Sequence, residues 1–120
     1  MSSLPESVLQ MQLNEVQGRV DVLEQRIRRQ AVVIPIQSLE PSPVDVVAPI
    51  LAVVQEDDGV FVASFVDANI NASGETQLDA MEMLKDVIAS TFQVFLSKED
   101  FLGEEPKRQL AVLRHFVRMR

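Results

Sequence analysis

The pattern of apolar and polar positions divides the middle of the chain into short β-rich runs followed by one long helix. Ile50–Gln55 and Val60–Val66 are rich in β-branched and aromatic residues, and Glu56–Gly59 between them has the composition of a turn. These segments predict a β-hairpin. Ile70–Ser73 predicts a third, weaker strand. We therefore expect an α+β fold built on a small antiparallel sheet of three or four strands.

The residues after the third run predict one amphipathic helix from Gln77 to about Ser97. Thr76 is the expected N-cap, because Asp79 stands three residues later, where its carboxylate can reach back to the free amides of the first turn. Apolar side chains recur at spacings of three and four, as in a buried helical stripe. The stripe consists of Leu78, Met81, Leu84, Ile88, Phe92, Phe95 and Leu96. Such a helix can cover one face of the sheet.

The run Val60–Val66 is apolar on both of its faces. Phe61, Ala63 and Phe65 lie on one face, and Val60, Val62 and Val66 on the other. A single helix covers only one face of a sheet, so a second cover is required. It must come from the rest of the chain or from another copy of the protein.

Apolar residues near the N terminus follow a heptad pattern. Leu9, Leu13, Val16, Val20, Leu23 and Ile27 recur at alternating spacings of four and three, which is typical of a coiled coil. In this register Arg19 at g and the following Glu24 at e would pair across a parallel two-stranded interface. We expect residues 1–30 to form an oligomerisation helix with these six side chains as its interface. An ordinary amphipathic helix packed on its own domain remains the alternative.

Prolines mark the segment between this helix and the hairpin. Pro35 within the apolar run Ala31–Ile36 favours an edge strand or an extended arm, and Pro41, Pro43 and Pro49 favour a stiff connector. We therefore expect residues 31–49 to be a Pro-containing arm and linker, and residues 50–120 to be the α+β domain.

A short second helix is expected near the C-terminal end of the sequence. Glu104–Pro106 has the composition of a helix start. The apolar side of this helix would consist of Leu110, Leu113, Phe116 and Val117.

The central motifs resemble a known family. Asp58-Gly59, Phe61-Val-Ala63, Phe65, Gly74-Glu-Thr76, Asp79-Ala80 and Leu84 resemble the HicB family, the antitoxin component of type II toxin-antitoxin pairs, over about Pro49 to Leu96. The resemblance implies a β-β-β-α unit with a partial ribonuclease H topology. It also implies a binding function, in which the antitoxin covers a small basic RNA-cleaving partner, HicA.

Two features of the sequence differ from the commoner pattern of that family. Asp67–Asn71 replaces the Pro-Gly-Cys element that usually closes the second strand. Neither a helix-turn-helix nor a ribbon-helix-helix module is visible after Leu96, so the resemblance does not extend to operator binding.

Charge is distributed unevenly along the chain, whose net charge is −7. Residues 1–30 contain four basic and four acidic residues, residues 31–106 two and fourteen, and residues 107–120 five and none. An acidic middle attracts a basic protein and repels nucleic acid, although acidity for solubility alone gives the same composition. The basic residues 107–120 could contact phosphates, or could complement their own helix dipole and an acidic neighbour.

The sequence offers little for catalysis. His115 is the only histidine and the chain has no cysteine, so neither a thiolate metal site nor a catalytic triad can be completed. Asp57 and Asp58 are adjacent and would point in different directions, which favours a turn over a shared metal. We therefore expect no enzymatic activity, no metal and no cofactor.

Together these patterns predict a non-catalytic, antitoxin-like binding protein that engages a small basic partner protein and associates with itself. The alternatives are a structural homo-oligomer that has lost toxin binding, and a transcription regulator. The start of the sequence has no basic region before an apolar one, and no apolar run approaches a membrane span. We therefore expect a soluble, cytoplasmic protein without membrane or nucleic-acid partners.

The N-terminal interface can be tested by placing charges in it. Val20→Asp combined with Leu23→Asp should convert the assembly to monomers, because unpaired carboxylates cannot be buried in an apolar seam. Light scattering measures the change in mass, and Val22→Asp, which lies off the seam, is the matched control. An unchanged mass in the double variant would show that these residues do not join copies.

Overall fold

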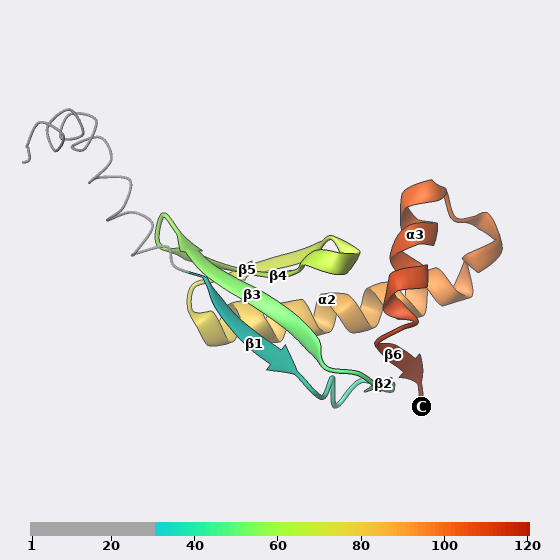
Figure 1. The fold of residues 1–120 in the computed structure, drawn as a ribbon, viewed down its shortest axis with the longest axis horizontal. Helices are drawn as coiled ribbons and strands as arrows, with labels where there is room; N and C mark the ends of the chain where they lie inside the picture. Colours follow the sequence, from blue (N-terminus) through green and yellow to red (C-terminus); the bar gives the residue numbers. More distant parts are fainter. Residues whose placement is uncertain (1–30) are drawn as a thin grey trace, which may run out of the picture. The chain divides into compact units, whose positions relative to one another are not determined.

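A computed structural model describes residues 31–120 (Figure 1). Its elements in chain order are β1 Val32–Ile36, β2 Val44–Val46, β3 Ile50–Asp57, β4 Val60–Phe65, the short 3-10 helix η1 Val66–Ala68, β5 Ile70–Gly74, α2 Gln77–Ser97, the 3-10 helix η2 Glu99–Phe101, α3 Glu104–Leu113 and β6 Val117–Met119. The expected interface Leu9, Leu13, Val16, Val20, Leu23 and Ile27 lies outside the described residues.

The main sheet has four antiparallel strands in the order β1-β3-β4-β5, which confirms the expected α+β class. Strands β3 and β4 form the predicted hairpin. Its turn is tighter than expected, because Glu56 pairs with Phe61 and only Asp58 and Gly59 remain between the strands. Asp58 and Gly59 both have a positive φ, of 55° and 80°, which suits a two-residue hairpin turn.

Residues 31–49, expected as an arm and linker, belong to the folded body. Strand β1 is the edge strand that Pro35 permits, and it pairs along its length with β3. Ile36, Leu39 and Val44 are buried in the core. Strand β2 pairs with β6 in a separate two-stranded ribbon, which Figure 1 shows beyond the far end of β1.

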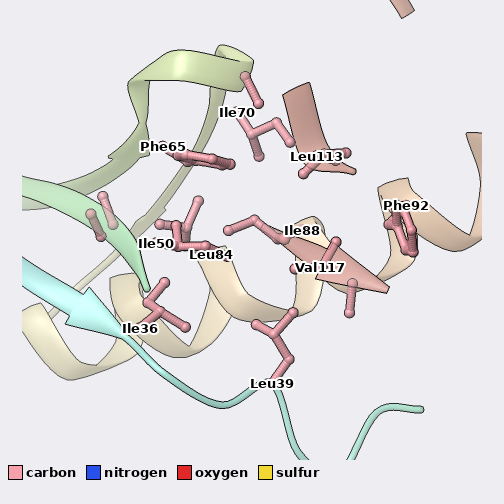
Figure 2. Packing of buried hydrophobic residues seen from close by; sticks show 14 of the residues in the cluster. Ile36, Leu39, Ile50, Phe65, Ile70, Leu84, Ile88, Phe92, Leu113 and Val117 are labelled. Carbon is pink, nitrogen blue, oxygen red and sulfur yellow. The ribbon is translucent and has the colours of Figure 1, made fainter. Parts of the chain in front are cut away.

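Helix α2 begins and ends as the sequence predicts, and it covers one face of the sheet. The Thr76 hydroxyl accepts a hydrogen bond from the Asp79 amide at 3.0 Å, as expected for an N-cap. The buried side chains of α2 are Ala80, Met81, Leu84, Ile88, Ala89 and Phe92. Figure 2 shows Leu84 and Ile88 directed toward Ile50 and Phe65 of the sheet.

The expected stripe of α2 is wrong at its first position, because Leu78 is 68% exposed. Ala80, which the stripe omitted, is fully buried in its place. Gly74 at the end of β5 lets the helix backbone approach so closely that a Cβ there would lie 2.5 Å from the Ala80 nitrogen. This contact sets the start of α2 against β5 and leaves Leu78 pointing away from the core.

Helix α3 begins at Glu104 as predicted but ends at Leu113, earlier than expected. Leu110 and Leu113 are buried on its inner side. Phe116 and Val117, expected on the same helical face, lie beyond its end, and Val117 belongs to β6. The Phe116 ring still reaches the core, because it packs edge-on against Phe65 with centroids 5.1 Å apart.

The close approach at Gly74 gives a test of the fold. Gly74→Ala should lower the free energy of unfolding by about 1–3 kcal/mol, because the added methyl group overlaps the backbone of α2. Gly103→Ser is the control, since nothing lies within 4 Å of a Cβ there and serine suits the N-cap of α3. Chemical denaturation measures both variants. An unchanged midpoint for Gly74→Ala would show that α2 does not sit this close to β5.

Candidate functional site

An apolar groove lies between the edge strand β1 and the first turns of α2. It has a volume of about 620 Å³ and opens to solvent. Ile34 and Ile36 line it from the strand, and Leu78 and Met81 from the helix. We call the space that these four side chains line the β1–α2 groove.

The groove exists because α2 does not lie over the centre of the sheet. The helix packs mainly across β5 and β4, and only weakly on β3. The side chains of β1 on the same face are consequently less covered toward the start of the strand. Ile36 is buried, Ile34 is half-buried and Val32 is 48% exposed. Leu78 therefore faces open apolar surface on the β1 side instead of the core.

The polar lining of this groove is mostly uncharged, and acidic residues lie beside it on α2. The uncharged polar residues are Gln37, Ser38 and Gln77. Glu82 and Lys85 both line it, and their side chains form an ion pair of 3.5 Å. Asp79 and Asp86 lie on the exposed surface of the same helix, and Glu75 directly precedes it. Lys85 is the only basic residue of α2, so the first half of the helix presents a net negative surface beside the groove.

Three of the basic residues near the C-terminal end form ion pairs with carboxylates of the described part of the chain. Arg114 donates two hydrogen bonds of 2.8 Å to the Glu99 carboxylate. Arg108 binds the carboxylate of Glu105 at 2.7 Å and also donates to the Asp67 carbonyl at 3.1 Å. Arg120 completes the set with Asp45 at 2.9 Å. This arrangement agrees with the alternative in which these cations complement acidic neighbours.

The bidentate hydrogen bonds from the two arginines lower the pKa values of two carboxyl groups. Hydrogen bonds from Arg114 hold the pKa of Glu99 below its usual range, and those from Arg108 do the same to the pKa of Glu105. The partners respond reciprocally, since the pKa values of both guanidinium groups are raised. All four groups are close to solvent, so each pair contributes little to the stability of the fold.

The sequence-level candidates for chemistry are not brought together. His115 is exposed in the segment between α3 and β6. Asp57 ends β3 and Asp58 occupies the hairpin turn, as the turn interpretation expects. Within residues 31–120, no three histidine or acidic side chains are grouped closely enough to hold a metal ion. In the same range, neither helix combines the length and apolar character that a membrane crossing requires.

Sequence reasoning did not find the β1–α2 groove, although each of its residues carried a signal. The apolar spacing predicts Leu78 in the core stripe, and the proline within Ala31–Ile36 favours an edge strand or an extended arm for Ile34 and Ile36. Only the offset of α2, which depends on the contact at Gly74, shows that these residues face one space.

Comparison with known proteins adds no family, since no family model, no curated protein and no solved structure matches the chain.

The Arg114–Glu99 pair predicts a pH-dependent effect. Because the folded-state pKa of Glu99 is lowered, the pair contributes stability above the unfolded-state pKa of the carboxyl, and this contribution is lost as the pH falls through the folded value. Arg114→Gln should therefore lower the Tm at neutral pH and leave it unchanged in acid. Thermal unfolding measures both, with Arg118→Gln as a control, since Arg118 has no ion pair within residues 31–120. An equal loss of Tm at both pH values would assign the effect to packing.

Proposed function

We propose that this chain is a non-catalytic binding protein of the antitoxin type, which holds a small basic protein against the β1–α2 groove. The observation that carries the proposal is the apolar groove beside a negatively charged helix face. Protein interfaces commonly combine a desolvated apolar centre with a polar rim, and both parts are present here.

The apolar part supports an anchor from the partner. Leu78 is 68% exposed, although leucine in a well-packed helix usually lies inside. Met81 and Ile34 extend the same surface. A partner side chain of moderate size, such as leucine or phenylalanine, could fill this space and be removed from water.

The charged part supports a basic partner. Residues 31–106 contain fourteen acidic and two basic residues, and the ion pairs of the described part engage Asp45, Glu82, Glu99 and Glu105. Within residues 31–120, Asp79 and Asp86 of α2 form no ion pair, so they add negative charge to the surface of this helix. A field of this sign speeds the approach of a cationic protein and orients it at the surface.

Nucleic acid is the less favoured ligand. Lys107 and Arg118 form no ion pair within residues 31–120, but the other three basic residues that could contact phosphates, Arg108, Arg114 and Arg120, already bind carboxylates of the body. A phosphate bound by these three arginines would have to break their ion pairs in a strongly acidic surrounding. This observation supports a protein partner over the role of a transcription regulator.

The first test is whether a gene next to that of this chain encodes a short basic protein, and the second is a binding titration of the two purified proteins. We expect a 1:1 complex whose affinity falls as salt rises. Leu78→Lys should weaken it at least tenfold, because it removes an apolar anchor and adds a charge of the partner's own sign. Isothermal titration calorimetry measures both effects.

Phe101→Lys is the matched control for this experiment. Phe101 is 88% exposed in η2, away from the groove, so the same substitution should leave the affinity unchanged. Both variants should keep the parent's thermal unfolding curve, since both positions are exposed. Absence of any complex with the basic protein, or equal loss in the two variants, would contradict the proposal.

A further inference from the structure

The face of the main sheet that points away from α2 is apolar and exposed. We name it the outer face. Its apolar members are Val33 and Pro35 of β1, Leu51 and Val53 of β3, and Val60 and Val62 of β4. Leu51 is 57% exposed and Val33 is 56% exposed, so this surface is open within residues 31–120.

The strand register makes these residues one continuous patch. Val33 pairs with Val53, and Pro35 with Leu51, so β1 and β3 contribute adjacent side chains. On the next strand Ser64 lies opposite Val53, and Val62 is the diagonal neighbour of Val53 because its direct partner is Gln55. Side chains that are directly opposite in an antiparallel pair lie about 4.5–5.5 Å apart at Cβ, which leaves little room for water between them.

At the hairpin end of the outer face, Asp57 lies opposite Val60 and carries a negative charge. The polar residues farther from this end are uncharged. They are Gln55, Ser64, Asn71 and Ser73, at the positions that alternate with the buried side chains of their strands. The absence of charge across these central positions matters in a chain with a net charge of −7. Two copies repel one another over most of their surfaces but can approach here without burying like charges.

We propose that the outer face is a contact between two copies of this chain, packed sheet against sheet. The same patch on both copies gives a self-complementary, two-fold interface. Two sheets packed in this way lie about 10 Å apart, with side chains of both filling the space. Valine and leucine side chains are suited to this spacing.

The size of the patch indicates how this contact is maintained. Strands about 4.8 Å apart with a rise of about 3.3 Å per residue give a face on the order of 400 Å² per copy. Stable interfaces bury about 1,200–2,000 Å² in total, so the outer face alone holds two copies weakly. The predicted N-terminal seam would supply the missing affinity, because joined copies meet at an effective concentration in the millimolar range.

This inference does not depend on the proposed partner. The β1–α2 groove lies on the helix-covered side of the sheet, and the outer face on the opposite side. A second copy and a basic protein could therefore bind the same molecule together.

Single-cysteine variants of the full chain test the contact, since the parent has no cysteine. Leu51→Cys places a thiol on the exposed apolar part of the outer face, and Phe101→Cys places one on an exposed position away from it. With a bis-maleimide spacer of about 10 Å, matched to the distance between packed sheets, the Leu51→Cys variant should give at least tenfold more cross-linked dimer than Phe101→Cys. This cross-linking should not decline on dilution while the N-terminal seam keeps the two copies joined.

Two results would overturn the proposal. Equal cross-linking of the two variants would show that copies meet without using the outer face. A Leu51→Cys thiol that reacts slowly with a monofunctional maleimide at every dilution, yet forms no cross-linked dimer, would show that another part of the same chain covers the patch. Both variants fold if their thermal unfolding matches the parent, because neither position is buried.

Discussion

One helix covers one face of a four-stranded sheet, and the rest of the structure depends on that contact. The covering face of α2 includes the fully buried Ala80, Leu84 and Ile88, and the fully buried sheet residues Ala52 and Ala63 belong to the same core. Small residues on the sheet let the helix approach closely, so the core is dense although the body is small. The same contact determines which surfaces stay open, because a single helix cannot cover four strands.

The position of the helix connects the fold to the proposed binding surface. Since α2 packs toward β5, the opposite edge strand β1 keeps part of its inner side uncovered. The open space becomes the β1–α2 groove, with Leu78 on one wall and Ile34 on the other. The acidic surface of α2 then places charge beside apolar area. An exposed apolar surface and an acidic helix are each common. This edge of the sheet is the candidate site because both occur there together.

Sequence reasoning recovered the elements whose signals are local. The β3–β4 hairpin follows from its turn residues, and the start of α2 from Thr76, whose cap is made within one turn. It failed where distant residues decide. The exposure of Leu78 depends on Gly74 and β5, and the strand at Val117–Met119 exists only through its pairing with β2. The acidic character of the site was foreseen from composition, whereas the groove was not, because it arises from the offset between helix and sheet. The resemblance to HicB antitoxins remains a prediction.

The β2–β6 ribbon has a consequence for how the chain reaches its folded state. Arg120 binds Asp45 across 75 positions of sequence, while β3, β4 and β5 pair with immediate neighbours. Local pairs close quickly and distant ones slowly, so the hairpins and α2 should assemble first. During synthesis, strand β2 (Val44–Val46) stays without its partner strand until Val117–Met119 has left the ribosome. Strand β6 should therefore pair with β2 after the rest of the domain has folded. Val44 and Val117 become buried only when this pairing forms.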